Sequence, residues 1–276
     1  MSNLAPRIEE HRFVSSDDVG LRYISCGDGY PVVLSTPIGL HLDFWKPLFA
    51  TRSAERFRFI ALQSRGLWGS QASHDPANDT VSRHGLDIAE LVGHEELNDY
   101  AMIGYCGGSA PLIEALQSVA KVPGNTLLIS TLFRRDRQEL IVRRVLERFE
   151  QSQRPSAYRM ILSVAFQAAV PEFQSIAEDE ICTTEKLPMY LRQLNSLYSF
   201  NFPNNIRSDT SIRVFLSSGD IDPIKESSCD YVNRMGGDAS KIETINDSDH
   251  FYLFNQPERA IDLISNSLLS NAGAIS

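Results

Sequence analysis

The sequence contains little cysteine and none of the spacings by which cysteine and histidine usually bind zinc. Its four cysteines, Cys26, Cys106, Cys182 and Cys229, lie far apart, and no C-x-x-C or H-x-x-x-H occurs. A structural or catalytic zinc site is therefore not expected. A chain of 276 residues can bury a sizeable core without disulfide bridges. We expect the thiols to be free, as in a reducing cytoplasm.

Basic charge and long apolar runs are also scarce. Lys and Arg number 26 against 35 Asp and Glu, which gives a net charge of −9. This balance argues against nucleic acid or an anionic membrane as a partner. No apolar run approaches the roughly 20 residues of a membrane helix, and the first ten residues lack the basic-then-apolar pattern of a secretory signal. We therefore expect a cytoplasmic protein with neither of these partners.

Apolar strand patterns alternate with helical patterns along most of the chain. Residues 21–26 alternate apolar and polar side chains, which is typical of an antiparallel strand. Residues 31–35 form a continuous apolar run, which is typical of a strand buried on both faces of a parallel sheet. Further strands are expected at 57–62, 99–103, 126–130, 211–216 and 241–245, and helices at 44–48, 81–91, after 106 and at 256–269. The fold class is therefore α/β, with a mostly parallel central sheet covered by helices on both faces.

The segment 134–200 differs from its surroundings, because it is charged and helical throughout. It is far longer than a crossover between two strands of one sheet requires. We expect a helical cap at 134–200, inserted into a core made of 1–133 and 201–276. Its apolar side chains are candidates to line a pocket or to pack the cap itself: Phe149, Tyr158, Met160, Phe166 and Phe173.

The segment from Tyr100 to Leu116 predicts a strand, an abrupt turn and a helix. Glycines stand on both sides of Cys106, at Gly104 and at the pair Gly107-Gly108. A turn this sharp holds its apical residue in a strained conformation and excludes nearby Cβ atoms. The apical side chain then projects above the sheet, next to the N–H groups of the helix start. Cys106 is thus a candidate nucleophile, although a glycine-rich turn with an inert buried thiol fits the segment equally well.

A nucleophilic cysteine gains from an adjacent base, which in turn needs an orienting acid. Asp220 and Asp222 follow the strand at 211–216, and His250 follows the strand at 241–245. Ligands in such sheets bind at the carboxyl ends of the strands. Among the histidines, only His250 combines a strand end with a position after Cys106.

In this order of nucleophile, acid and base, the chain resembles the α/β-hydrolase superfamily over nearly its whole length. The segment 219–223 looks like the family's acid loop, with Asp222 at the acid position and Asp220 in reserve. The segment 249–258 is similar to its catalytic-histidine loop and closing helix, and 63–70 to a segment of its cofactor-free members. The resemblance implies a Cys106-His250-Asp222 triad, no cofactor and no metal.

Two departures from the family pattern bear on the chemistry. The family usually has serine at the elbow, and a minority with cysteine includes dienelactone hydrolases and thioesterase-like enzymes. The second departure is Pro37, which stands where the family's second oxyanion-hole N–H is expected and has none to donate. Gly107 supplies the first donor, and either Ile38 N–H or the Thr36 hydroxyl replaces the second. Otherwise the reaction develops no full oxyanion.

These residues predict an acyl-processing enzyme: a thioester, ester or lactone hydrolase or an acyltransferase that forms a covalent acyl-cysteine. The alternatives are a lyase or isomerase on the same scaffold, and a small-molecule-binding protein without turnover. Gln63 and Trp68 also depart from the family segment. Trp68 either lines the pocket mouth or is an aromatic side chain packed against other residues. The expected partner is a small acyl substrate, including a carrier-bound thioester, and the oligomeric state stays open. The candidate substrate contacts are Tyr105, Pro37, Trp68 and Phe251.

Overall fold

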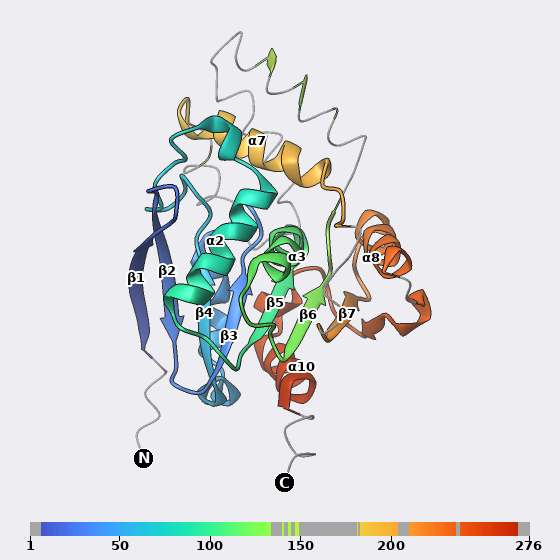
Figure 1. Ribbon diagram of the computed structural model, residues 1–276. Coiled ribbons are helices and arrows are strands. Elements are labelled where there is room, and N and C mark those ends of the chain that lie inside the picture. The colour runs from blue at the N-terminus through green and yellow to red at the C-terminus, as the bar shows by residue number, and fades with distance from the viewer. Residues whose placement is uncertain are drawn as a thin grey trace.

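The computed structural model describes residues 7–133, 140, 143–144, 147–148, 181, 183–203, 210–235 and 238–269. A single twisted sheet runs through the centre of this part of the chain (Figure 1). Its eight strands follow the order β1-β2-β4-β3-β5-β6-β7-β8. The strands are β1 (Ile8–Val14), β2 (Gly20–Cys26), β3 (Tyr30–Ser35), β4 (Phe57–Leu62), β5 (Ala101–Tyr105), β6 (Asn125–Ile129), β7 (Ile212–Ser217) and β8 (Glu243–Ile245).

Strand direction agrees with the sequence pattern. β2 pairs antiparallel with both β1 and β4, and every pair from β4 to β8 is parallel. Successive side chains of a strand point to opposite faces. In β3, Val33 belongs to one apolar cluster while Val32 and Leu34 belong to the other. Every residue of β5 is buried and the strand is a continuous apolar run, whereas β8 at the sheet edge has two exposed polar residues, Glu243 and Thr244.

Helices cover both faces of the sheet. Side chains of α2 (Val81–His94) and α3 (Ser109–Ser118) belong to one cluster, and those of α1 (Lys46–Phe49), α9 (Tyr252–Asn255) and α10 (Pro257–Leu269) to the other. The helix expected at 44–48 is a 3-10 turn at Leu42–Trp45 that runs into α1. Two further helices among the described residues are α7 (Lys186–Tyr198) and α8 (Asp222–Arg234). The predicted α/β architecture is confirmed.

The helix α7 is the main described part of the segment predicted as a cap. It crosses the upper end of the sheet, above the strand ends, in Figure 1. The boundaries 134–200 stay a prediction. Phe149, Tyr158, Met160, Phe166 and Phe173 lie outside the described residues. None of the helices within the described ranges is long and apolar enough to cross a membrane.

Candidate active site

Cys106 occupies the sharp turn that the sequence predicts between β5 and α3. Its φ is +49°, a left-handed conformation that non-glycine residues rarely adopt. A Cβ added at Gly104 would lie 2.8 Å from the Cα of Ser109, and one added at Gly108 would lie 2.2 Å from the carbonyl oxygen of Ser35. Both glycines are therefore required by close backbone approach, and together they allow the chain to turn tightly enough to display Cys106.

His250 lies in the loop after β8 and pairs with Asp220. Its Nδ1 lies 2.7 Å from Oδ1 of Asp220. The other carboxylate oxygen, Oδ2, accepts hydrogen bonds from the backbone N–H of Ser217 at 2.8 Å and from the hydroxyl of Ser130 at 2.7 Å. Asp220 is almost completely buried, at 2% exposure. Oδ2 is thus held in place by two hydrogen bonds, whereas Oδ1 faces the imidazole.

The assignment of Asp222 as the partner of His250 is wrong. β7 ends at Ser217, and a tight turn with a hydrogen bond from Asp220 N to Ser217 O folds Asp220 back against the strand end. Asp222 is already the first residue of α8 and is exposed. Pro223 fits this position because the first turn of a helix needs no donor from it. Asp220, the reserve candidate, therefore provides the carboxylate next to the histidine.

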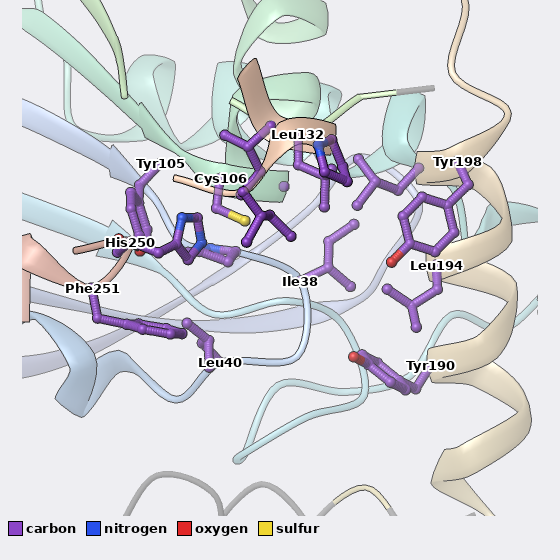
Figure 2. A pocket seen from close by; sticks show the side chains of 16 residues that line it. Ile38, Leu40, Tyr105, Cys106, Leu132, Tyr190, Leu194, Tyr198, His250 and Phe251 are labelled. Carbon is purple, nitrogen blue, oxygen red and sulfur yellow. Dashed lines mark hydrogen bonds between the residues drawn. The ribbon is translucent and has the colours of Figure 1, made fainter. Parts of the chain in front are cut away.

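The sulfur of Cys106 and the ring of His250 lie side by side in the pocket (Figure 2). Because Nδ1 faces Asp220, Nε2 is the ring nitrogen available to the sulfur. Burial disfavours the charged ring, but the negative charge of a Cys106 thiolate and the carboxylate of Asp220 outweigh it. Together they raise the pKa of His250 from 6.5 to about 10. The charged form of the His250 ring is therefore favoured at neutral pH.

Tyr105 supports the histidine loop from the strand below. Its hydroxyl donates a hydrogen bond to the carbonyl oxygen of His250, and its ring stacks on the imidazole at a centroid distance of 5.4 Å. Phe251 contacts the same imidazole edge-on at 5.0 Å. His250 is therefore held by the hydrogen bond to its backbone carbonyl, by the rings of Tyr105 and Phe251, and by Asp220.

A pocket of about 330 Å³ opens above Cys106. No Asp, Glu, Lys or Arg occurs among its lining residues in the described part of the chain. Its lining combines loop residues with one face of α7 and the start of α8 (Figure 2): Pro37, Ile38, Leu40, Tyr105, Cys106, Gly107, Leu132, Tyr190, Leu194, Leu197, Tyr198, Ile221, Pro223, Ile224, His250 and Phe251. The volume lies at the small end of ligand pockets, and the lining suits an apolar, uncharged group.

Three of the four candidate substrate contacts, Tyr105, Pro37 and Phe251, lie in this lining, whereas Trp68 does not. The indole of Trp68 packs edge-on against His41, with ring centroids 5.4 Å apart, and joins the margin of the core. Trp68 therefore lies outside the lining of this pocket. Its alternative interpretation as a packed aromatic agrees with the structure.

Of the three candidate oxyanion-hole residues, two lie at the pocket and one does not. Gly107 lies in the first turn of the helix that follows Cys106, where backbone N–H groups have no partner within the helix. Ile38 lines the pocket, and its N–H has no acceptor within the described ranges. Thr36 is fully buried outside the pocket lining, and its hydroxyl accepts a hydrogen bond from the Trp45 indole at 3.0 Å. Thr36 is thus not placed to serve a substrate.

Within the described residues, no group of three His, Cys, Asp or Glu side chains could hold a metal ion. What the site does contain is a displayed thiol, a basic ring that contacts it, a buried carboxylate behind that ring and a small apolar pocket. Chemically, this set can attack an electrophilic carbon and move a proton at the attacked group.

Comparison with known proteins gives likenesses of structure alone. No protein-family model matches the sequence, and no curated protein matches it. A carboxylesterase structure from the thaumarchaeon Nitrososphaera gargenis has a TM-score of 0.74 at 19% identity, over 96% of this chain and 100% of that one. A thermophilic esterase from Thermogutta terrifontis has 0.71 at 18%, over 94% and 97%. An N-acyl homoserine lactonase mutant complexed with N-hexanoyl homoserine has 0.72 at 13%, over 96% and 97%. The chain has the α/β-hydrolase fold.

Proposed function

We propose that this protein is an acyl-processing enzyme that forms a covalent thioester between its substrate's acyl group and Cys106. The observation that carries the proposal is the placement of Cys106 beside the His250 ring in an apolar pocket, with the ring hydrogen-bonded to the buried carboxylate of Asp220. A thiolate is the nucleophilic form of cysteine, and a base held by an acid keeps the thiol in that form.

The geometry supports a two-step reaction. In the first step the sulfur of Cys106 attacks the carbonyl carbon, and the carbonyl electron pair moves to oxygen. The oxyanion then collapses, and the leaving group departs with the proton of the His250 imidazolium. In the second step neutral His250 takes a proton from water or another acceptor, which attacks the thioester and releases the thiolate. Asp220 orients the ring and stabilises its charged form throughout.

Ile38 N–H is the proposed second donor to the oxyanion, beside Gly107 N–H. Leu40 N donates to Pro37 O at 3.0 Å, and Gly39 has a φ of +88°. This is the pattern of a type II turn, with Ile38 at its second position and glycine at its third. The turn leaves Ile38 N–H without an internal acceptor next to the pocket. The donor missing at Pro37 is thereby replaced one residue later.

The structural neighbours support ester and lactone carbonyls as substrates, since those proteins are described as esterases and as an N-acyl homoserine lactonase. Cysteine at the elbow adds acyl thioesters, because an acyl-cysteine exchanges readily with thiols. Within the described residues the lining of this pocket contains no Asp, Glu, Lys or Arg, which favours a neutral, apolar acyl group of modest size. The segment 134–200, which contributes α7 to the pocket wall, is proposed as a cap over the site.

The test is intact-protein mass spectrometry during turnover of p-nitrophenyl acyl esters, acyl thioesters and N-acyl lactones. We expect a mass increase equal to the acyl group, located on Cys106 by peptide mapping, and loss of both adduct and turnover in Cys106→Ala. Cys229→Ala, which changes a cysteine outside the pocket, serves as the matched control. Turnover by Cys106→Ala at the parent rate would exclude the covalent mechanism.

The absence of an N–H at Pro37 supports a second candidate, an elimination or rearrangement that develops no full oxyanion. In that reaction Cys106 and His250 would only move protons. It predicts product formation without any acyl adduct on Cys106, so the same mass spectra separate the two functions.

A further inference from the structure

A second, much smaller cavity lies behind the active-site pocket. Its volume is about 10 Å³, and Ile38 lines both it and the larger pocket. This is roughly the smallest volume that holds one water molecule. Unlike the apolar pocket, the small cavity is lined mainly by polar side chains: Ser64, Arg65, Asn78, Thr80, His84 and Gln193.

Three of these side chains present a buried polar atom without a hydrogen-bond partner in the described residues. The atoms are Oγ of Ser64, Nε2 of His84 and Oε1 of Gln193. All three residues are more than nine-tenths buried. They come from three separate elements, which are the loop after β4, α2 and α7. Folded proteins contain a few such atoms per hundred residues, but three that line one cavity indicate a common ligand.

The neighbours of these atoms fix their hydrogen-bonding roles. Gln193 donates from Nε2 to the backbone carbonyl oxygen of Arg65 at 3.2 Å, so the side-chain oxygen Oε1 of Gln193 is the atom left to accept a hydrogen bond. His84 places Nδ1 3.9 Å from Oδ2 of Asp87, which favours a proton on Nδ1 and leaves Nε2 as an acceptor. The hydroxyl of Ser64 can donate. The cavity therefore presents two acceptors and one donor.

We infer that this cavity binds one water molecule, which accepts a hydrogen bond from Ser64 and donates to His84 and Gln193. Water has two donor hydrogens and accepting lone pairs, so it satisfies all three atoms at once. Buried waters in globular proteins typically make about three such bonds. The Arg65 guanidinium is already occupied by Asp17 and Asp87 and is not needed as a partner.

The water would complete the polar attachment of α7 to the core. Arg192 binds Asp79 at 2.6 Å, and the hydroxyl of Ser196 accepts from Val81 N at 2.9 Å. Gln193 lies between them in sequence and would reach α2 through the water. The next residues of the same helix, Leu194 and Leu197, line the active-site pocket. The water is thus a positioning element for the pocket wall, and this consequence rests on the proposed function.

Ser64→Ala tests the water site without any activity measurement. If water is bound, the substitution removes one of its three partners, and the midpoint of thermal unfolding falls by about 1–4 °C. If the cavity is dry, the substitution deletes an unsatisfied buried hydroxyl, and the midpoint stays or rises. Ser265→Ala in α10 is the matched control, because its hydroxyl is also buried without a partner in the described residues and lies away from this cavity. Its midpoint should stay or rise.

A crystal structure at about 1.5 Å resolution should show a solvent peak at hydrogen-bond distance, about 2.6–3.2 Å, from all three atoms. No peak in the parent, or an unchanged midpoint in Ser64→Ala, overturns the inference. With an active protein, Ser64→Ala should also raise KM for acyl substrates while kcat stays unchanged, because the pocket wall moves and the triad does not. A confirmed water in an inactive protein would refute the proposed function alone.

Discussion

Replacing Asp220 with asparagine should disable the site while replacing Asp222 should not. The two residues are separated by one position, and both follow β7. Only Asp220 touches His250, through Oδ1 at 2.7 Å from Nδ1. Asp222 faces solvent on the first turn of α8. The pair Asp220→Asn and Asp222→Asn is therefore a matched comparison, with the same chemical change at a contacting and a non-contacting position.

The structure determines how an asparagine at 220 would be oriented. Ser217 N–H and the Ser130 hydroxyl both donate to Oδ2 of the present carboxylate. An amide must turn its oxygen toward these two donors, so its NH₂ group faces Nδ1 of His250. That group donates where a carboxylate accepts. The imidazole is then held with its proton on Nε2, the nitrogen that must receive the thiol proton.

Two effects set the magnitude. A hydrogen bond between charged groups contributes about 1.5–3 kcal/mol, which corresponds to roughly 10- to 150-fold in rate. The wrong tautomer adds to this loss, and the analogous change in serine proteases lowers kcat about 10⁴-fold. For Asp220→Asn we expect kcat/KM to fall between about 10² and 10⁴, and for Asp222→Asn less than about twofold, as is usual at an exposed position.

The assay is hydrolysis of a p-nitrophenyl acyl ester, together with the rate at which iodoacetamide alkylates Cys106 at pH 7. Both rates should fall in Asp220→Asn, because the imidazolium that stabilises the thiolate is lost. Thermal unfolding of each variant separates a chemical loss from misfolding, since Asp220 is buried. A folded Asp220→Asn with parent activity, or a larger loss in Asp222→Asn, would refute this assignment.

Three further predictions follow from single contacts. Ile38→Pro keeps the turn, whose second position suits proline, but removes the proposed donor, so kcat should fall about 10²–10³-fold, whereas Ile38→Val should keep it. Ser130→Ala removes a hydrogen bond to the carboxylate of Asp220 and should lower kcat about tenfold at unchanged KM. His250 has a pKa of about 10 in the folded protein against 6.5 in the unfolded chain. Its contribution to the free energy of unfolding is therefore fully present below pH 6.5 and is lost as pH rises through 10. Urea unfolding across this range should show the free energy of unfolding decline, and His250→Gln should lack this decline.

The strands, the elbow and the histidine loop were predictable because their signals are local. Continuous apolar runs indicate buried strands wherever they occur in the chain. The glycines around Cys106 identify a turn that only small residues allow, and the structure shows the clashes that larger ones would cause. The position of His250 after the last strand placed it at the same edge of the sheet as Cys106.

The choice between Asp220 and Asp222 was not local. It depends on β7 ending at Ser217 and on a hydroxyl from Ser130, which is 90 residues away in sequence. A single sequence contains both aspartates at plausible positions and no pattern that joins Ser130 to either. The signal that existed was the short turn at 217–220, where Asp often occurs and folds back on its own backbone.

The residues of the pocket wall could not be predicted from a local sequence pattern either. Tyr190, Leu194, Leu197 and Tyr198 share one face of α7, which is the periodicity of any amphipathic helix, and nothing in it shows what that face covers. Trp68 and Thr36 illustrate the converse. Both were candidate site residues, but Trp68 packs against His41 and the Thr36 hydroxyl accepts a hydrogen bond from Trp45.

The composition of the pocket and the charge state of the triad constrain each other. Burial opposes the charged form of the His250 ring, but its neighbours Cys106 and Asp220 outweigh this and raise the pKa of His250 to about 10. A neutral acyl group that fills the pocket excludes water and strengthens this attraction. A substrate with a carboxylate beside the sulfur would compete for the imidazolium and lose its own hydration among apolar side chains. We therefore expect the proposed enzyme to prefer uncharged acyl groups.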